Sequence, residues 1–244
     1  MRHRFCPLLP KDSLRGPVLA LAAHPDDEVI GAGALLAWHA RKGHDVLVVH
    51  LTDGARGDPS GASSDIKAAR RAEGARALAR LGIARLEHWD LPDGELPEHL
   101  DELEPRVRDL FARAAPATLY SFWFGEAHRD HRAVAELTAR CAGALPTDCR
   151  CLLFGVNMVP PGGTLFDTTD CYPAKKHALA AYESQLVYFD LVGLSEYRDR
   201  AATVNVDVPG VLYGELYADL APSALAEARA RAESLQSLLL GGDE

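Results

Sequence analysis

The 244-residue sequence has few cysteines and no long apolar run. Its five cysteines are odd in number and irregularly spaced, so they offer no disulfide framework, and we expect a reducing compartment, the cytoplasm. Cys149 and Cys151 share one face of an apolar stretch and are expected to be small buried hydrophobes rather than metal ligands. No segment approaches the roughly 18 apolar residues of a membrane span, and the run 17–23 lies at the short limit of a signal peptide. The sequence therefore predicts neither export nor a membrane span.

The sequence also lacks an excess of positive charge. Its net charge of -9 argues against a nucleic-acid partner, because such proteins carry a basic face. No Gly-x-Gly-x-x-Gly follows the first apolar strand, which argues against a dinucleotide-binding module. Gly31 and Gly33 lie inside a predicted helix instead, and we expect them to allow close packing.

What the sequence does contain is an alternation of apolar strands and helical patterns. Strands are expected at residues 18–23, 45–51, 85–89, 117–122 and 151–156. Helices are expected at residues 28–42, 63–80 (capped by Ser63 or Ser64), 99–113, 133–140 and 174–185. This alternation favours an α/β fold with a mostly parallel sheet and helices on both faces.

The C-terminal part gives a weaker signal. Residues 204–208 and 211–217 are expected to form an antiparallel strand pair that turns at Pro209-Gly210. Residues 223–240 are expected to form a helix that packs on the body or makes a homo-oligomer contact. No repeat, linker or boundary is visible, so the chain 1–244 is expected to be a single domain with its motifs in residues 17–217.

A polar cluster, His24-Pro25-Asp26-Asp27-Glu28, directly follows the first predicted strand. It is consistent with an ordinary helix start, because proline suits the first turn and acids complement the helix dipole. It is equally consistent with a metal site, because His24 and Asp27 are three residues apart and can point at one place. An imidazole and a carboxylate are two of the three protein ligands of a catalytic zinc site, and Asp26 could then serve as a base beside the metal.

A second cluster, His128-Arg129-Asp130-His131, follows the predicted strand 117–122. Two surface histidines at a helix start would be the plain interpretation. Ligands in open α/β sheets bind beyond the carboxyl ends of the strands, however, and both clusters occupy that position. We therefore favour a metal site with three ligands from the two clusters and a further group left for catalysis.

Two other loops follow predicted strands. The loop 52–61 contains Asp53 and Arg56, which we take as candidate substrate-binding residues, since arginine is suited to holding a hydroxyl or carboxylate. Asp93-Gly94 is a turn signal, so Asp93 is expected to be a turn residue rather than a ligand.

Together the two clusters closely resemble those of the LmbE-like (PIG-L) family of zinc-dependent de-N-acetylases. The resemblance covers about residues 18–217 and is supported by Leu51-Thr52-Asp53-Gly54, Arg71-Ala72-Glu73, Leu91-Pro92-Asp93-Gly94 and Tyr182-Glu183-Ser184-Gln185. It implies a Rossmann-like fold and a small-molecule substrate, an N-acetylated amino sugar or its conjugate, from which an acetyl group is removed.

The resemblance also implies roles for individual residues. His24, Asp27 and His131 would bind zinc, and Asp26 would be the general base. A protonated His128 would stabilise the oxyanion or assist the leaving amine, and Asp130 would orient a histidine. The chain departs from many members in having Arg129 in place of a proline, and from some members in having Glu126 in place of a tyrosine.

Three alternatives remain open at the level of the sequence. The substrate could be a non-sugar N-acyl compound, with the same metal-dependent amide hydrolysis. The native metal could be iron or cobalt, because nitrogen and oxygen sites bind several divalent ions. The protein could instead be a nucleotide- or sugar-binding module without catalysis, which would bind no stoichiometric metal.

Overall fold

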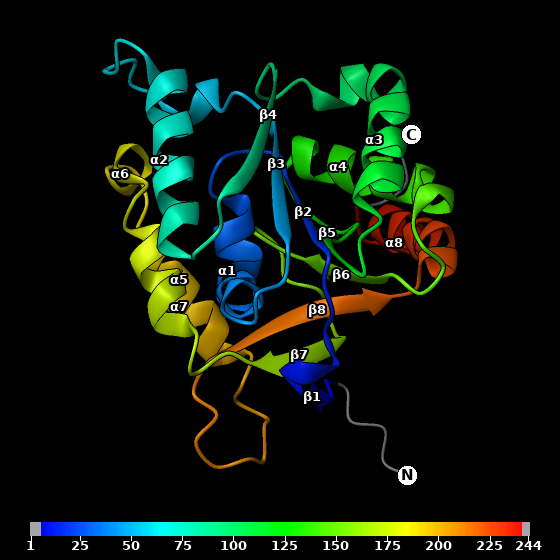
Figure 1. Cartoon of the computed structure of the whole chain (residues 1–244). Coiled ribbons are helices and arrows are strands. Elements are labelled where there is room, and N and C mark those ends of the chain that lie inside the picture. The colour runs from blue at the N-terminus through cyan, green and yellow to red at the C-terminus, as the bar shows by residue number, and fades with distance from the viewer. Residues whose placement is uncertain (1–5, 241–244) are drawn as a thin grey trace.

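A computed structural model describes residues 6–240, in which one eight-stranded sheet is surrounded by helices (Figure 1). The strands are β1 (Leu8–Leu9), β2 (Val18–Ala22), β3 (Val46–Thr52), β4 (Arg85–Leu91), β5 (Thr118–Phe122), β6 (Arg150–Phe154), β7 (Thr164–Asp167) and β8 (Gly214–Leu220). The order across the sheet is β1-β7-β8-β6-β5-β2-β3-β4. The run from β4 to β6 is parallel, whereas β8 is antiparallel to both β6 and β7. The expected mostly parallel α/β sheet is confirmed.

The helices lie on both faces of this sheet (Figure 1). They are α1 (Asp27–Arg41), α2 (Ile66–Arg80), α3 (Leu100–Ala114), α4 (Arg129–Arg140), α5 (Tyr172–Leu179), α6 (Glu183–Leu186), α7 (Leu191–Ala201) and α8 (Leu225–Leu240). Helices α1, α2 and α5 cover one face, and α3, α4 and α8 cover the other. Strands β2 and β5 are therefore buried along their whole length. Strand β2 is continuously apolar in sequence, as expected of a strand covered on both faces, whereas β5 also contains Thr118 and Ser121, whose hydroxyl groups are hydrogen-bonded.

The N-terminal elements agree with the sequence to within a few residues, but two details differ. Asp65, not Ser63 or Ser64, caps α2, because the helix begins at Ile66 and the Asp65 carboxylate accepts the Ala68 N–H at 3.0 Å. Helix α4 begins at Arg129, four residues earlier than expected, so that Asp130 and His131 lie in its first turn.

The C-terminal predictions were less accurate. The helix expected at 174–185 is divided into α5 and α6. Of the strand pair expected at 204–208 and 211–217, the second strand is found a few residues later as β8, whereas the first strand and the pairing between the two are wrong. Val204 and Val208 are exposed in a loop, and β8 pairs with β7 and β6 instead. Short β-branched runs indicate strands only where a neighbouring strand is available, and that depends on the tertiary fold. Helix α7 and strands β1 and β7 were not predicted.

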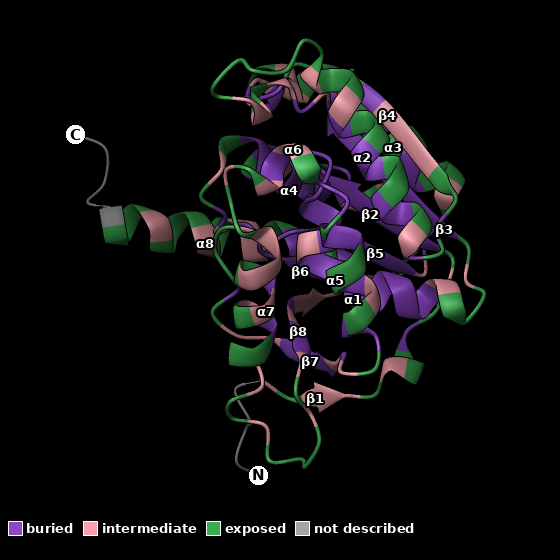
Figure 2. Cartoon of the chain, turned by 90° about the vertical axis from the view of Figure 1, so that its left-hand side faces the viewer, coloured by how far each residue is buried: buried purple, intermediate pink, exposed green. Residues whose placement is uncertain are grey.

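Helix α8 packs its first turns on the body and then extends away from it (Figure 2). Arg229 forms a 2.7 Å ion pair with Glu136 of α4, whereas Leu238 is exposed.

In the part of the chain that the structure covers, no helix has the length and apolarity to cross a bilayer. The five cysteines are free, and Cys149 and Cys151 are buried as expected. The oligomer contact, the single-domain organisation and the cytoplasmic location stay predictions.

Gly31 of α1 lies directly against the Phe154 ring of β6, which confirms the expected packing role. A Cβ atom at Gly31 would lie 2.1 Å from that ring. Alanine normally favours a helix over glycine by about 1 kcal/mol. We nevertheless expect Gly31→Ala to destabilise the protein by about 1 to 3 kcal/mol, because the overpacked ring must shift.

Denaturant unfolding measures this effect. Gly143→Ala is the matched control, since a Cβ there meets no atom within 4 Å. Equal unfolding midpoints for the two variants would show that Gly31 is not a close packing contact.

Candidate active site

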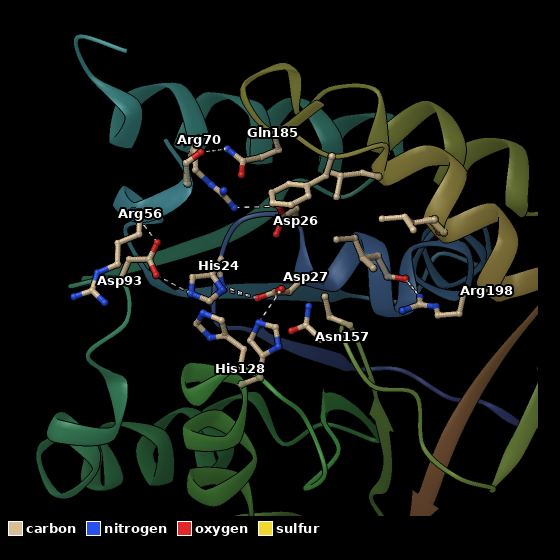
Figure 3. A pocket seen from close by; sticks show the side chains of 18 residues that line it. His24, Asp26, Asp27, Arg56, Arg70, Asp93, His128, Asn157, Gln185 and Arg198 are labelled. Atoms are coloured by element: carbon tan, nitrogen blue, oxygen red, sulfur yellow. Dashed lines mark hydrogen bonds and ion pairs between the residues drawn. The ribbon is translucent and has the colours of Figure 1, made fainter. Parts of the chain in front are cut away.

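The site lies between β2 and β5, where the order of the strands reverses: β3 and β4 follow on one side of β2, and β5 and β6 on the other. The helices that follow these neighbouring strands, α1 and α4, lie on opposite faces of the sheet (Figure 1). Such a switch point leaves a crevice beyond the carboxyl ends of the strands, where ligands bind in open α/β folds. His24 follows β2 and His128 precedes α4, so both line this crevice, which forms a cavity of about 380 Å³ (Figure 3).

Asp27 links the two histidines that were expected to bind metal. Its Oδ2 lies 3.3 Å from His24 Nδ1 and accepts the His24 backbone N–H at 2.7 Å, and its Oδ1 lies 3.2 Å from His131 Nε2. Ring nitrogens of His24, His128 and His131 also lie within 4.8 Å of one another. The structure therefore brings all three expected ligands together, with His128 beside them.

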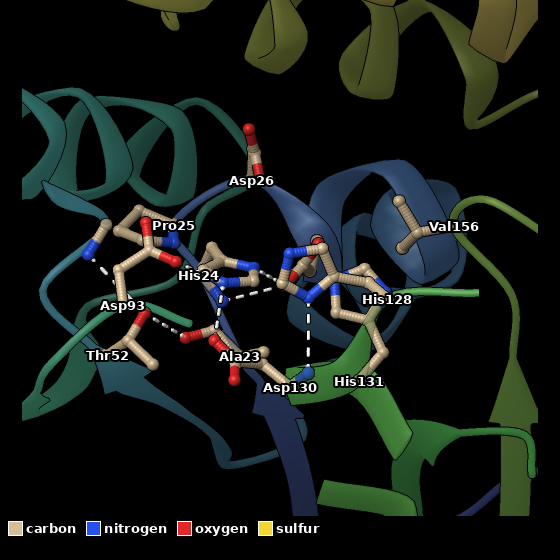
Figure 4. A network of polar contacts seen from close by, with 12 residues as sticks. Ala23, His24, Pro25, Asp26, Thr52, Asp93, His128, Asp130, His131 and Val156 are labelled. Carbon is tan, nitrogen blue, oxygen red and sulfur yellow. Dashed lines mark hydrogen bonds and ion pairs between the residues drawn. The ribbon is translucent and has the colours of Figure 1, made fainter. Parts of the chain in front are cut away.

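The far nitrogen of His24 is held by two carboxylates (Figure 4). His24 Nε2 lies 3.2 Å from Asp130 Oδ2 and 3.0 Å from Asp93 Oδ1, and Asp130 also accepts the N–H groups of Gly94 and Leu96. Asp93 does form a turn with Gly94, but it contacts the site as well, so the prediction that it is only a turn residue was incomplete. These contacts leave Nδ1 as the His24 nitrogen that faces Asp27.

Glu126 holds His131 in the same way, and sequence reasoning had noted it only as a departure from a family pattern. Its Oε2 lies 2.9 Å from His131 Nδ1, and its Oε1 accepts backbone N–H groups of Val156, Asn157 and Met158 at 2.5 to 3.2 Å. The carboxylate is fully buried. One side chain therefore connects the histidine to the loop that forms a wall of the cavity.

Replacing Glu126 with glutamine should weaken metal binding by about 10- to 100-fold, the usual effect of losing a partner of a metal-binding histidine. A neutral amide can accept the His131 N–H or the loop N–H groups, but not both. Competition with a chelator measures the affinity. Glu98→Gln, which removes the same charge from an exposed pair with Arg129, is the control. Unchanged affinity in Glu126→Gln would show that Glu126 serves only to hold the loop.

Asp26 occupies a strained position at the start of α1. Its φ of 132° and ψ of -28° lie outside the regions favoured by non-glycine residues, a type of strain that concentrates at functional sites. Arg70, which was not predicted, donates to the Pro25 carbonyl at 2.6 Å and to Asp26 Oδ2 at 3.1 Å. Burial raises the pKa of Asp26 to about 7, although Arg70 acts to lower it. A divalent cation nearby would lower this pKa again, leaving a base at neutral pH.

His128 lies beside the expected ligands and is half-buried. Burial and the neighbouring His24 and His131 lower its pKa below the usual value, which favours the neutral ring. The Asp130 N–H donates to His128 Nδ1 at 3.2 Å. Nε2 must then carry the hydrogen, and the ring keeps one donor.

The electrostatic environment suits a cation. Burial lowers the pKa of His24, but hydrogen bonds to Asp130, Asp27 and Asp93 outweigh it and raise that pKa well above its usual value. Burial is likewise outweighed at His131, where Asp27 and Glu126 raise the pKa to about 9. The carboxylates thus favour positive charge at these rings. This set of imidazole and carboxylate donors fits zinc and other divalent transition metals.

Only one of the two candidate substrate residues lies at the cavity. Arg56 lines it, and its backbone N–H donates to Asp93 at 2.9 Å. Asp53 does not line it, since its carboxylate is paired with Lys67 at 2.6 Å in a separate hollow. Ile30 of α1 adds an apolar contact. Most of the remaining wall comes from loops and short helices that sequence reasoning did not connect with the site: Val156, Asn157, Gln185, Phe189, Leu191, Leu194, Ser195 and Arg198.

Comparison with known proteins agrees with this geometry. Residues 19–142 match the family described as PIG-L, GlcNAc-PI de-N-acetylase. The chain is 28% identical over 144 residues, or 57% of its length, to a deacetylase named YaiS from Escherichia coli K12, and covers 75% of that protein. It is 31% identical over 120 residues, or 47% of its length, to diacetylchitobiose deacetylase from Thermococcus kodakarensis, and covers 45% of it.

Structural similarity extends over more of the chain. The structure of N,N'-diacetylchitobiose deacetylase from Pyrococcus horikoshii, complexed with its inhibitor MPG, has a TM-score of 0.74 at 21% identity and covers 85% of this chain and 84% of its own. At that identity the likeness establishes the fold. The family match covers half of the sequence, including both clusters, and the chain therefore belongs to the GlcNAc-PI de-N-acetylase (PIG-L) family of LmbE-like deacetylases.

Proposed function

We propose that the protein is a zinc-dependent hydrolase that removes the acetyl group from an N-acetylated amino sugar of the N-acetylglucosamine type, or from its conjugate. The observation that carries the proposal is the convergence of His24, Asp27 and His131 with the buried Asp26 in one cavity. Two relatives named as diacetylchitobiose deacetylases support the substrate class.

His24, Asp27 and His131 would hold the ion. When bound, zinc lowers the pKa of a water molecule towards about 7 and polarises the amide carbonyl. Iron or cobalt would satisfy the same donors. Asp130 and Asp93 fix the ring of His24, and Glu126 fixes that of His131, so both histidines are oriented before substrate binds.

Asp26 would transfer the proton. It takes a proton from the attacking water as the water oxygen bonds to the acetyl carbon, and it passes that proton to the departing amine as the C–N bond breaks. Arg70 holds the carboxylate in place through its 3.1 Å contact. The products are acetate and the free amino sugar.

His128 would stabilise the oxyanion. Because its Nδ1 accepts the Asp130 N–H, its Nε2–H is the available donor, and a neutral imidazole can supply this hydrogen bond. Such a donor contributes about 3 to 4 kcal/mol in comparable oxyanion sites. Arg56, Asn157 and Gln185 at the cavity wall are suited to sugar hydroxyls, whereas Asp53 has no part in this scheme.

Release of free amine from a panel of N-acetylglucosamine conjugates by the metal-loaded protein tests the proposal. Turnover of at least one conjugate is expected. Turnover confined to N-acyl amino acids or other non-sugar amides would identify the protein as a different amidase. A protein that binds no stoichiometric metal and releases no amine would be a binding module, and the proposal would fail.

A further inference from the structure

The candidate metal ligands belong to separate parts of the fold. Asp27 lies in the first turn of α1, whereas His131 lies in α4 and is held by Glu126, which also accepts N–H groups of the loop that follows β6. A functional site works only while its groups stay within about 0.5 Å of the productive geometry. The contacts that fix α1 relative to the loop after β6 therefore bear on metal binding.

Arg198 of α7 joins these two parts directly, at the end of the cavity that Figure 3 shows beyond Asn157. Its Nη1 donates to the Gly155 carbonyl at 2.6 Å, at the start of the loop that Glu126 holds. Its Nη2 donates to the Ile30 carbonyl in α1, three residues after Asp27. Arginine suits such a contact, because its planar guanidinium presents several donors in a fixed geometry.

The two carbonyls flank a close packing contact between the same elements. Gly31 of α1 lies against the Phe154 ring of β6, as described above. Arg198 binds the residue before Gly31 and the residue after Phe154. Packing limits how closely α1 and β6 approach, and the two hydrogen bonds keep them from separating. Together these contacts set the distance between the two elements.

Helix α1 is opened to outside partners at this position. In a regular helix the Ile30 carbonyl accepts the N–H of Ala34, four residues later. The Ala34 N–H also donates to Glu215 Oε1 of β8 at 3.0 Å, and the Leu35 N–H donates to Glu215 Oε2 at 3.0 Å. A side chain from α7 and one from β8 therefore contact the two ends of the same helical hydrogen bond. This arrangement ties α1 to both elements shortly after its metal-site residues.

Arg198 is itself held from behind by buried charges. Its Nε lies 3.5 Å from Asp199 Oδ1, and Asp199 Oδ2 lies 2.6 Å from Lys175 Nζ. Lys175 and Asp199 are both buried, and Lys175 also lies 2.8 Å from Glu215. Separating a buried ion pair leaves an uncompensated charge, so this group of side chains resists rearrangement. The guanidinium is therefore fixed in place before any ligand binds.

We propose that Arg198 is a positioning residue for the metal site, which fixes Asp27 and His131 relative to each other through α1 and the loop after β6. The inference rests on the proposed function, which assigns a metal ion to these ligands. Arg198 also lines the cavity, but both of its terminal nitrogens are directed at backbone carbonyls. It acts on the site through the elements that it joins.

Arg198→Met tests this inference, because methionine keeps the apolar part of the side chain but donates no hydrogen bond. We expect zinc binding to weaken by about 10-fold in competition with a chelator, the lower end of the range for loss of a group that orients a metal ligand. The direction of the change separates positioning from charge. Removing a positive charge from the cavity would by itself favour a bound cation, whereas displaced ligands weaken its binding.

Arg200→Met is the matched control. It removes the same charge from an exposed position of α7, where Arg200 pairs with Glu196 at 3.3 Å. Its zinc affinity should equal that of the wild type. The visible spectrum of a cobalt-loaded sample reports ligand geometry, and it should change in Arg198→Met and not in Arg200→Met. Circular dichroism checks the fold. If Arg198→Met is unfolded, Arg198→Gln, whose amide can donate to one of the two carbonyls, takes its place with the same expectation.

Combining Arg198→Met with Glu126→Gln tests the route of the effect. If both side chains act on His131 through the same loop, the loss of affinity in the double variant should be smaller than the product of the two single losses. Losses that multiply would show that the two side chains act independently, and would overturn the proposed link.

The remaining results separate the two proposals. Unchanged zinc affinity and an unchanged cobalt spectrum in Arg198→Met would overturn the inference and leave the deacetylase proposal standing. A raised KM with unchanged metal affinity would assign Arg198 to substrate binding and would likewise contradict it. If the wild type binds metal but releases no amine, the proposed function fails, and the metal affinities of the variants still decide the inference. A wild-type protein that binds no metal would overturn both.

Discussion

Asp26→Asn is expected to lower kcat by about 10²- to 10⁴-fold, the range typical for loss of a general base. Asparagine keeps the size of the side chain and its contact with Arg70, but it cannot accept the proton of the attacking water. Steady-state amine release measures the effect, and metal analysis of the same sample should still find one ion per chain. The loss would then lie in proton transfer rather than in assembly of the site.

Asp109→Asn on the exposed face of α3 is the control for the loss of one negative charge. Its kcat should equal that of the wild type. An Asp26→Asn protein that keeps its metal and works within about twofold of the wild-type rate would remove Asp26 from the mechanism.

Removal of the metal is expected to lower kcat/KM by about a thousandfold or more, because polarisation of the carbonyl and activation of water are each worth several kcal/mol. Treatment with a chelator followed by dialysis tests this, and added zinc should restore activity. His131→Gln tests the same point genetically. The glutamine can still contact Glu126, but it lacks the imidazole nitrogen that faces Asp27 at 3.2 Å.

Metal content and activity should fall together in His131→Gln, and circular dichroism should show that the variant is folded. Full activity in a chelated sample with less than about one tenth of its metal would exclude metal-dependent hydrolysis. If iron or cobalt but not zinc restored activity, we would reassign the native metal and keep the same ligands.

The buried strands and the two His/Asp clusters could be predicted because their signals are local. The strands β2, β3 and β5 are buried at every position, so they are mostly apolar in the sequence, with a few buried polar residues such as His50 in β3 and Ser121 in β5. His24 and His128 lie close to the ends of two such runs, and parallel strands place those ends at one edge of the sheet. Two polar clusters that each follow a buried parallel strand therefore lie close together in most sheets of this kind.

The strand predicted at residues 204–208, and its pairing with residues 211–217, failed for the opposite reason. Val204 and Val208 are typical strand residues, but they form no strand in the described part of the chain, and β8 instead pairs with β6 and β7. Pairing between strands more than 40 residues apart depends on the packing of the whole sheet. Composition alone does not encode it.

The sequence by itself determined the fold class and indicated the two His/Asp clusters that the structure brings together at the carboxyl ends of β2 and β5. Only the tertiary structure showed that Glu126 and Asp93 support the histidines, that Arg70 holds Asp26, and that Asp53 faces away. Metal-binding motifs are short and repeat at strand ends, whereas the Asp93 and Arg70 contacts and the cavity walls join side chains from distant parts of the chain, which come together only when the sheet and its helices have packed.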